Sequence, residues 1–263
     1  MADRGLGAVR EAHRFDEAAL AGWLEDNVAG YAGPLTVSQF SGGQSNPTYK
    51  LHTPSRDYVL RRKPPGALLK GAHAVEREHR VISALHAAGF PTPKTYGLCE
   101  DEGVIGTPFY VMDMVEGRNF WNTAFPDVSR EERTALFDAM NATIASLHSI
   151  DPAAVGLGDY GRPGNYFERQ IGRWSKQYLD DSDAGRVAAM DRLIDWLPAN
   201  IPPGDEASIV HGDFRCDNML FHPTEPRVVA VLDWELSTLG HPLADFAYHL
   251  MVYRMPPGFS TGL

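Results

Sequence analysis

The sequence has few cysteines, few basic side chains and no long apolar run. Its 263 residues contain two cysteines, Cys99 and Cys216, so no disulfide framework is implied and a reducing compartment is expected. No segment reaches the roughly 18 apolar residues of a membrane span, and residues 1–15 lack the apolar core of a signal peptide. We therefore expect a soluble, cytoplasmic protein without a membrane partner.

Basic residues are outnumbered by acidic ones, 24 to 34, which gives a formal net charge of −10 at pH 7. Binding to a phosphate backbone needs clustered lysine and arginine, so we expect no nucleic-acid partner. Residues 116–263 hold 21 of the acidic side chains against 12 basic ones. This imbalance suits a cationic ligand or a metal, and it suits equally a solvated acidic surface that favours solubility. The composition leaves the oligomeric state open.

The first part of the chain predicts five strands and two helices. After a short amphipathic helix over residues 13–29, the segments LTVSQF, TYKLHT and DYVLRRK are typical of three strands joined by turns. The segment AHAVEREHRVISALHAAG predicts a helix that ends at Gly89, and Pro91 follows as a stop signal. TYGLC and PFYVMDM predict two more strands, so one helix is inserted into a five-stranded unit.

The character of the chain changes at the segment VEG, residues 115–117, which we interpret as a hinge. Strands dominate the part before it, and helices dominate the part after it. We therefore expect an α+β fold with two lobes, a small β-rich lobe over residues 1–115 and a mainly helical lobe over residues 116–263.

The second part opens with a long predicted helix. In SREERTALFDAMNATIASLHSI, Ser129 and Glu132 form a capping box, and apolar residues follow at helical spacing. Two further helices are predicted near residues 165–180 and 184–197. Three tryptophans at apolar positions are more typical of a packed core than of ligand stacking, namely Trp174, Trp196 and Trp234.

Polar side chains are concentrated in the stretch HGDFRCDN, residues 211–218. The segment MLFH after it predicts a strand, PTEPR a turn and VVAVLDW a returning strand. Antiparallel pairing in such a hairpin brings Asn218, before the first strand, beside Asp233, at the end of the second. Asp213 lies one short loop upstream, so we expect these three side chains to converge.

The three converging side chains fit phosphoryl transfer to a hydroxyl. One amide and one carboxylate offer hard oxygen ligands and leave room for water and phosphate oxygens, as in a Mg²⁺ site shared with a nucleotide. The remaining carboxylate is free to accept a proton. Phosphoryl transfer needs this division because its loose transition state depends on positioning and charge neutralisation.

The tripeptide HGD of this stretch, Asn218 and the later tetrapeptide LDWE resemble the catalytic and metal-binding motifs of the aminoglycoside phosphotransferase (APH) family, relatives of protein kinases. The resemblance covers roughly residues 30–255. It implies a bilobal, protein-kinase-like fold whose C-terminal lobe carries the catalytic loop and a β-hairpin. It also implies ATP as the phosphoryl donor and Mg²⁺ as a cofactor.

The resemblance assigns roles to single residues of the second lobe. Asp213 matches the base or hydroxyl-orienting residue, and Asn218 and Asp233 match the Mg²⁺ ligands. Arg215 takes the place of a phosphate-facing lysine in many protein kinases. Four neighbours have no reactive role in this interpretation: His211 fixes the loop backbone, Cys216 is a small filler, Asp245 braces the loop, and His241 stays unassigned.

In the first lobe, the turn SGGQSNP can bring backbone N–H groups and a hydroxyl onto phosphates, although a flexible hairpin loop would have the same composition. Family members have a comparable loop, so the resemblance implies that Gly42, Gly43 and Ser45 contact the nucleotide. It also implies that the segment from Met112 to Val115 is the hinge against which adenine binds.

Glu78 falls on the apolar stripe of its predicted helix, and a carboxylate turns inward only with a partner. Strand alternation in DYVLRRK gives Arg61 and Lys63 the same face. The resemblance aligns Arg61 with the nucleotide-contacting lysine of the family, and Lys63 remains an alternative.

A small-molecule kinase accounts for both lobes. A protein kinase needs an activation segment, and the eleven residues between Asp233 and Asp245 are too few for one. A metal-dependent hydrolase would leave the first lobe unexplained. A non-catalytic nucleotide-binding module remains the alternative of another class, although every expected catalytic side chain is present.

The resemblance is closest, in AVEREHRV, residues 147–178 and LSTLGHPLADFAY, to a branch whose kinase-like domains also occur fused to acyl-CoA dehydrogenases. It implies a hydroxyacyl-CoA thioester as the phosphoryl acceptor. An aminoglycoside is the alternative, which the acidic second lobe favours because aminoglycosides are polycations. Family members continue with further helices that help to build the acceptor pocket, so we expect this chain to be truncated at its C-terminal end.

Overall fold

The computed structural model describes residues 5–41, 46–66, 73–183 and 185–255. The first part of the chain forms a six-stranded antiparallel sheet in the order β1-β2-β3-β4-β6-β5. The five predicted strands are confirmed, and a sixth, β1, has only two residues, too few to leave an alternating pattern in the sequence. The strands are β1 (Leu6–Gly7), β2 (Thr36–Phe40), β3 (Thr48–His52), β4 (Asp57–Arg62), β5 (Thr95–Cys99) and β6 (Phe109–Asp113).

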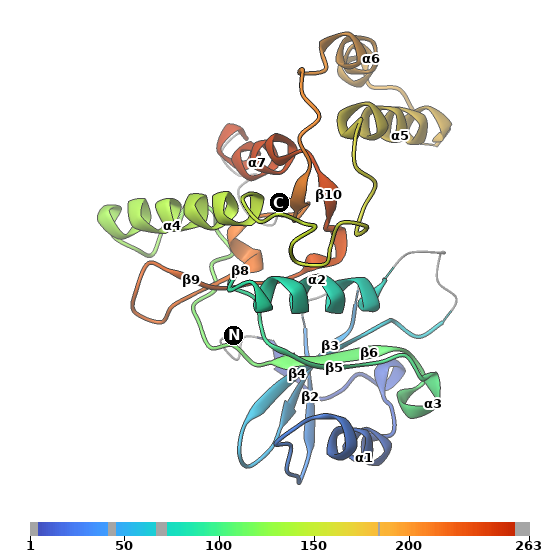
Figure 1. Ribbon diagram of the computed structural model, residues 1–263, viewed down its shortest axis with the longest axis vertical. Helices are drawn as coiled ribbons and strands as arrows, with labels where there is room; N and C mark the ends of the chain where they lie inside the picture. Colours follow the sequence, from blue (N-terminus) through green and yellow to red (C-terminus); the bar gives the residue numbers. More distant parts are fainter. Residues whose placement is uncertain (1–4, 42–45, 67–72, 184, 256–263) are drawn as a thin grey trace.

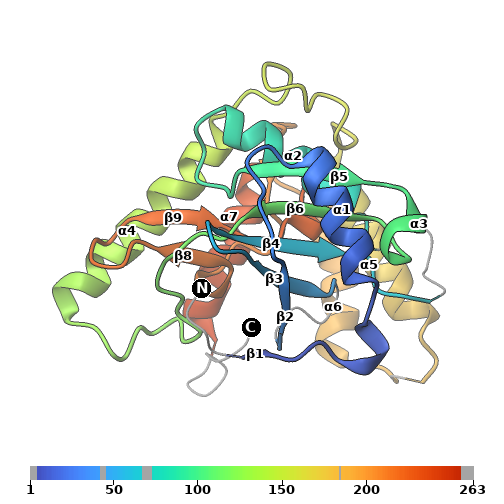
Figure 2. The ribbon, with the colours of Figure 1, turned by 90° about the horizontal axis from the view of Figure 1, so that it is seen from below.

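Helices cover both faces of this sheet. Helix α1 (Glu17–Asn27) packs on one face, and α2 (Val75–Ala87) packs its apolar stripe on the other. Strand alternation supplies both layers, because Leu60 of β4 joins the cluster around α1 whereas the preceding Val59 joins the cluster around α2. Figure 1 shows the two helices on opposite sides of the strands, and Figure 2 shows α1 lying over them.

After β6 the chain leaves the sheet and builds a second, mainly helical part, although the exact boundary between residues 115 and 116 stays a prediction. The predicted hairpin is confirmed, since Met219 pairs with Val231 in an antiparallel register. The elements that follow the sheet are α4 (Arg130–His148), α5 (Tyr166–Asp180), α6 (Ala188–Trp196), β7 (Ser208–Val210), β8 (Met219–Phe221), β9 (Val228–Val231), β10 (Thr238–Gly240) and α7 (Pro242–Met251). A four-residue helix, α3 (Glu102–Ile105), precedes β6, and 3₁₀ turns lie at Glu11–His13, Leu197–Asn200, Cys216–Asn218, Trp234–Leu236 and Val252–Arg254.

The capping box predicted for α4 forms only in part. Ser129 Oγ accepts a hydrogen bond from Glu132 N at 3.1 Å, as expected. The carboxylate of Glu132 instead forms an ion pair with Arg118, whose Nη1 lies 2.6 Å from Glu132 Oε1. A long-range ion pair therefore competes with the local cap, which the sequence pattern could not indicate. None of the described helices is long and apolar enough to span a membrane.

The prediction that three tryptophans are core residues is right for one and wrong for two. Trp234 is fully buried, whereas Trp174 and Trp196 are 53% and 57% exposed. Their helices, α5 and α6, project from the rest of the molecule in Figure 1 and contain no buried residue. An amphipathic pattern predicts which side of a helix is apolar, but not whether another element covers that side.

Candidate active site

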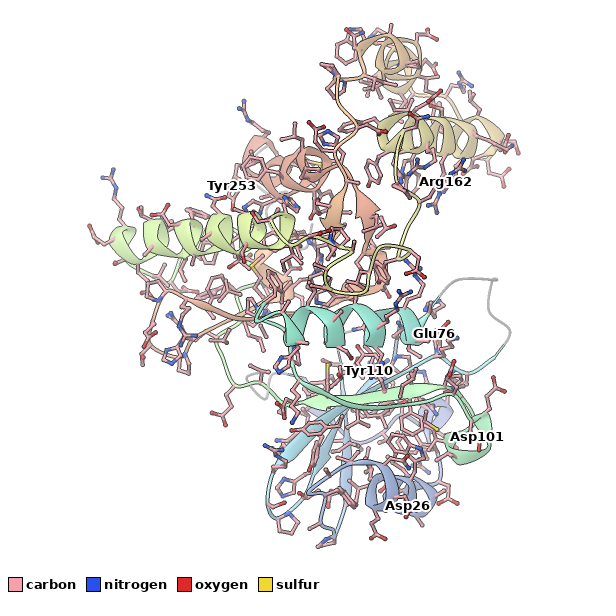
Figure 3. The ribbon with its side chains drawn as sticks, in the orientation of Figure 1. Asp26, Glu76, Asp101, Tyr110, Arg162 and Tyr253 are labelled. Carbon is pink, nitrogen blue, oxygen red and sulfur yellow. The ribbon has the colours of Figure 1, made fainter. Side chains whose placement is uncertain are left out.

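The buried carboxylate of α2, Glu78, has its partner on β4. Arg61 Nε lies 2.8 Å from Glu78 Oε2, and the side chain of Glu78 is 1% exposed. Asn46 Nδ2 donates to Glu78 Oε1 at 2.8 Å. The hydroxyl of Tyr110, a side chain that lies between β6 and α2 in Figure 3, donates to Oε2 at 2.9 Å. The inward carboxylate is thus fully partnered, which satisfies the condition for burying it.

Lys63, the other candidate partner, is excluded because it pairs with Glu76 at 2.9 Å. Burial raises the pKa of Glu78 to about 6, and the Arg61 guanidinium acts in the opposite direction. For Arg61, burial lowers the pKa, but the carboxylates of Glu78 and Asp233 outweigh it and raise the pKa above its ordinary value. The pair is therefore an ion pair near neutral pH.

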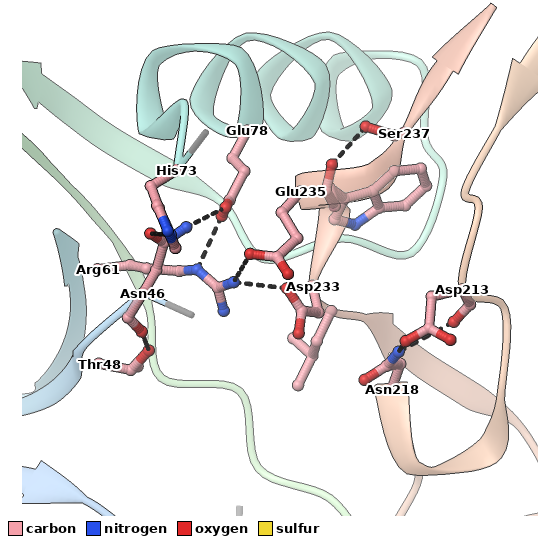
Figure 4. Close-up of polar contacts among 12 residues, drawn as sticks. Asn46, Thr48, Arg61, His73, Glu78, Asp213, Asn218, Asp233, Glu235 and Ser237 are labelled. Carbon is pink, nitrogen blue, oxygen red and sulfur yellow. Dashed lines mark hydrogen bonds and ion pairs between the residues drawn. The ribbon is translucent and has the colours of Figure 1, made fainter. Parts of the chain in front are cut away.

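The same guanidinium reaches the end of the β8–β9 hairpin. Arg61 Nη2 lies 2.5 Å from Asp233 Oδ1 and 3.6 Å from Glu235 Oε2 (Figure 4). Asp233 has a φ of 64°, a left-handed conformation that few residues other than glycine adopt. Oxygen atoms of Glu78, Asp233 and Glu235 lie within 4.8 Å of one another. The end of the hairpin is therefore rich in hard oxygen donors, of which sequence reasoning missed Glu235.

Asp213 and Asn218 are joined by side-chain hydrogen bonds. Asn218 Nδ2 donates to Asp213 Oδ2 at 2.8 Å and to the Asp213 carbonyl oxygen at 2.9 Å (Figure 4). Leu232 N donates to the Asn218 carbonyl oxygen at 2.8 Å, which keeps Asn218 beside the residue that precedes Asp233. Because its amide nitrogen is bound by Asp213, Asn218 turns its amide oxygen away from that carboxylate. The structure thus joins Asp213 to Asn218 directly and places Asn218 beside Leu232, one residue before Asp233.

A side chain of α7 holds the backbone of the loop that residues 211–218 form. Asp245 accepts hydrogen bonds from His211 N and Gly212 N at 2.9 Å each, and His148 Nε2 lies 3.0 Å from it. Burial alone would raise the pKa of Asp245, but these donors lower it below its ordinary value. The fully buried His211 ring donates from Nε2 to the Leu232 carbonyl oxygen at 2.9 Å. His211 and Asp245 therefore have the framing roles that the sequence indicated.

Asp213 has two further contacts, of which the sequence indicated neither. The hydroxyl of Tyr248 donates to Asp213 Oδ1 at 2.7 Å, and Arg215 Nε lies 3.1 Å from the same oxygen. Arg215 Nη2 also lies 2.9 Å from Asp217 Oδ2. Arg215, expected to face a phosphate, thus lies between two carboxylates. Tyr248 lies three residues after Asp245 on α7, so the two side chains share one face of that helix.

Two residues that carried no reactive role have structural ones. The Cys216 side chain is buried, and burial raises the pKa of its thiol to about 12, so the reactive thiolate is disfavoured. His241 caps α7, because its Nδ1 accepts a hydrogen bond from Leu243 N at 3.2 Å.

A cavity of about 610 Å³ opens where the sheet meets the hairpin. Arg61, Asn218 and Asp233 lie on its wall, and Met112 belongs to its apolar lining together with Phe40, Ile82, Leu220 and Val231. Val115, the other predicted hinge residue, is not among the lining residues. Gly42, Gly43 and Ser45 lie outside the described residues. The cavity can therefore hold a ligand with a flat apolar end and a charged end.

A sheet covered by α2, a buried Arg–Glu pair and a loop with a hairpin beside it define a phosphotransferase of protein-kinase-like fold, so the expected fold class is confirmed. The chain belongs to the phosphotransferase enzyme family (APH), which matches residues 36–260.

Known proteins resemble the chain over most of its length. Acyl-CoA dehydrogenase family member 11 of Gallus gallus is 49% identical over 262 residues, which are 98% of this chain and 34% of that protein. The chain thus spans about a third of the length of such relatives. A crystal structure of a candidate aminoglycoside phosphotransferase from Ralstonia eutropha is 56% identical, with a TM-score of 0.85 over 93% of this chain and 72% of that one.

A more distant structure shares the fold alone. A thermostable mutant of the aminoglycoside phosphotransferase APH(4)-Ia, in complex with ADP and hygromycin B, is 18% identical with a TM-score of 0.63, over 89% of this chain and 76% of that one.

Proposed function

We propose that this protein transfers the γ-phosphoryl group of ATP, with Mg²⁺, to the hydroxyl of a hydroxyacyl-CoA thioester. The observation that carries the proposal is the placement of Arg61, ion-paired to Glu78, at one wall of a cavity that Asn218 and Asp233 also line. A nucleotide in this cavity would place its phosphates next to the loop that holds Asp213.

The nucleotide would bind across the cavity. Its adenine fits the apolar end, which Met112 lines, and its phosphates fit the charged end. The guanidinium of Arg61 is anchored by Glu78, so its fork is oriented before a phosphate arrives. Gly42, Gly43 and Ser45 remain predicted phosphate contacts from the neighbouring turn.

The metal would be held at the end of the hairpin. Asp233 supplies a carboxylate oxygen, and Asn218 supplies the amide oxygen that is turned away from Asp213. This donor set of hard oxygens fits Mg²⁺, which also keeps water and phosphate oxygens as ligands. When bound, Mg²⁺ neutralises charge on the phosphate oxygens. In the structure Arg61 forms an ion pair with Asp233. Arg61 would therefore release the Asp233 carboxylate as the nucleotide binds.

Asp213 would orient the acceptor hydroxyl and take its proton. The carboxylate is fixed within the loop by Asn218, and the loop is fixed by Asp245. A hydroxyl held in line with the γ-phosphorus needs little further organisation, which is the main requirement of a loose transition state. Arg215, beside Asp213, is a second cation near the reacting atoms.

The acceptor class follows from the relatives. The relative from Gallus gallus is named an acyl-CoA dehydrogenase family member, and this chain matches only a third of it. A phosphotransferase segment within a chain of that name favours an acyl-CoA thioester that carries a hydroxyl. An aminoglycoside remains the second candidate, because two solved structures with this fold are described as aminoglycoside phosphotransferases.

A direct screen tests the proposal. The protein is incubated with ATP and Mg²⁺ in separate reactions containing hydroxyacyl-CoA thioesters or aminoglycosides, including hygromycin B, and each acceptor is analysed by mass spectrometry. We expect one phosphoryl group to be added to a hydroxyacyl-CoA, and addition about a hundredfold slower or more with Asp213→Asn. Phosphorylation of aminoglycosides alone would overturn the acceptor class, and tight ATP binding without any transfer would favour a non-catalytic module.

A further inference from the structure

Helix α7 contacts the loop at two levels. Asp245 binds the backbone N–H groups of His211 and Gly212, whereas Tyr248 binds the carboxylate of Asp213 itself. Asp245 and Tyr248 are three residues apart, so one face of α7 presents both side chains to the loop. The first contact accounts for the loop's shape. The second adds nothing to the backbone and acts only on the reactive group.

The contacts of the Asp213 carboxylate are unevenly distributed. At Oδ1 the Tyr248 hydroxyl donates at 2.7 Å, and Arg215 Nε lies 3.1 Å away. At Oδ2 the structure gives one donor among the described residues, Asn218 Nδ2 at 2.8 Å (Figure 4). A carboxylate offers about two lone-pair positions on each oxygen. Each oxygen has one hydrogen-bond donor, but Oδ1 also faces the Arg215 guanidinium, whose Nε makes an ion-pair contact and no hydrogen bond to any residue that the structure describes. A hydroxyl that approaches Asp213 therefore finds the less crowded oxygen at Oδ2, next to Asn218.

The Tyr248 hydroxyl is suited to act as a permanent hydrogen-bond donor. Burial, followed by its contact with Asp213, raises the pKa of Tyr248 to about 12, so the phenol keeps its proton at neutral pH. Tyrosine also has few rotatable bonds, and its ring lies on a helix rather than on the loop. The carboxylate is thus tied to a helix that lies outside the loop.

We propose that Tyr248 is a positioning residue for phosphoryl transfer, which occupies Asp213 Oδ1 and so directs the acceptor hydroxyl to Oδ2. This inference rests on the proposed function. In the step, the acceptor oxygen forms a bond to the γ-phosphorus while the bond from that phosphorus to the bridging oxygen of ADP breaks. The electron pair stays on ADP, and the hydroxyl proton passes to Asp213 Oδ2. Tyr248 keeps its proton throughout.

The test compares Tyr248→Phe with a matched variant, Tyr253→Phe. Tyr253 lies five residues further on and packs its ring against Phe137 and His249, so the same atom is removed without loss of the hydrogen bond that Tyr248 donates to Asp213. With the acceptor that the wild type phosphorylates, Tyr248→Phe should lower kcat about tenfold, in the range of one hydrogen bond to a charged group. The acceptor KM and the affinity for Mg-ATP should stay within about twofold. Tyr253→Phe should leave all three unchanged.

A second arm asks whether Tyr248 acts through Asp213. In the background of Asp213→Asn, adding Tyr248→Phe should cause no further loss of kcat, because the carboxylate it positions is gone. A further tenfold loss in that background would overturn the inference. So would a loss of Mg-ATP affinity that matches the loss of kcat, since Tyr248 would then support the fold of the site in general.

Failure of the proposed function gives a different result. If the wild type phosphorylates no acceptor, the proposed acceptor is wrong. The wild type, Tyr248→Phe, Asp213→Asn and the double variant are then compared by their rate of ATP hydrolysis, in which water supplies the hydroxyl. A tenfold loss for Tyr248→Phe alone, absent in the Asp213→Asn background, supports the positioning role there. Equal hydrolysis rates for the wild type and Tyr248→Phe overturn it.

Discussion

Arg61 of β4 and Asp233 at the end of β9 are 172 residues apart in the sequence, and their side chains form an ion pair with an N–O distance of 2.5 Å. This pair joins the sheet to the hairpin across the cavity. Because the same guanidinium binds Glu78, one side chain ties α2, β4 and the hairpin together. In our proposal, a nucleotide that enters the cavity meets a site whose cation and proposed metal-binding carboxylate are already in place, but bound to each other.

Replacing Arg61 by alanine should destabilise the protein and weaken nucleotide binding. The change leaves the carboxylate of Glu78 buried without its cation, and breaking a buried ion pair in this way costs about 3–5 kcal/mol. Urea unfolding measures the change in the free energy of unfolding, and calorimetry measures the ATP affinity.

The control for this variant is Lys63→Ala, one residue beyond the end of the same strand. Lys63 and Glu76 form a partly exposed pair, with side chains 24% and 39% exposed, and such pairs contribute about 1 kcal/mol or less. Equal decreases in the free energy of unfolding for Arg61→Ala and Lys63→Ala would show that the buried Arg61–Glu78 pair stabilises the fold no more than a partly exposed pair does.

Substitutions of Asp213 and of Asp233 should affect different properties, phosphoryl transfer in the first case and Mg-ATP binding in the second. Asp213→Asn should lower the rate of transfer by about a hundredfold or more and keep the rise in melting temperature that Mg-ATP causes, because Asp213 contacts neither the metal nor the nucleotide in our proposal. Asp233→Asn should reduce that rise, and removal of the metal with EDTA should reduce it in the wild type as well. Full turnover by Asp213→Asn, or an undiminished rise in Asp233→Asn, would contradict the respective role.

The sequence predicted the parts of the site that depend on local order. Asn218 and Asp233 meet because a hairpin of that length has one antiparallel register, and the sequence shows its strands and turn. The choice between Arg61 and Lys63 could not be predicted, since alternation gives both the same face and only packing against α2 distinguishes them. Contacts between distant segments, such as that of Tyr248 with Asp213, depend on how α7 docks, which no local pattern encodes.

Gly212 should tolerate no side chain. Its φ is 83°, and a Cβ at this position would lie 2.8 Å from the Leu236 carbonyl oxygen, closer than such atoms approach. Gly212→Ala should therefore cost about 1–3 kcal/mol of stability and lower activity by displacing Asp213. The control is Gly172→Ala in α5, where a Cβ meets nothing within 4 Å. That change should stabilise the helix by up to about 1 kcal/mol. A Gly212→Ala variant with unchanged stability and activity would mean that the loop can move away from Leu236.

His249 should make the protein less stable in mild acid. Burial lowers the pKa of His249, although a hydrogen bond from its ring to the Phe214 backbone and the charge of Asp245 act in the opposite direction. The unfolded chain, with an ordinary histidine pKa of about 6.5, therefore binds a proton that the folded chain resists. The stability that His249 contributes is present above about pH 6.5 and is lost as the pH falls below it. The contribution of His249 to the free energy of unfolding should thus fall between pH 7 and pH 5, whereas that of Glu78, whose pKa burial raises to about 6, changes in the opposite direction.

His249→Gln tests this dependence, because glutamine does not titrate. The free energy of unfolding of the variant, measured by urea titration at several pH values, should change less between pH 7 and pH 5 than that of the wild type. Gly172→Ala of α5 is the control, since it changes no titratable group and a Cβ there meets nothing within 4 Å. The pH dependence should be unaltered in Gly172→Ala. A wild-type slope that survives in His249→Gln would assign the acid sensitivity to another group, with His79 of α2 next in order because burial lowers its pKa too.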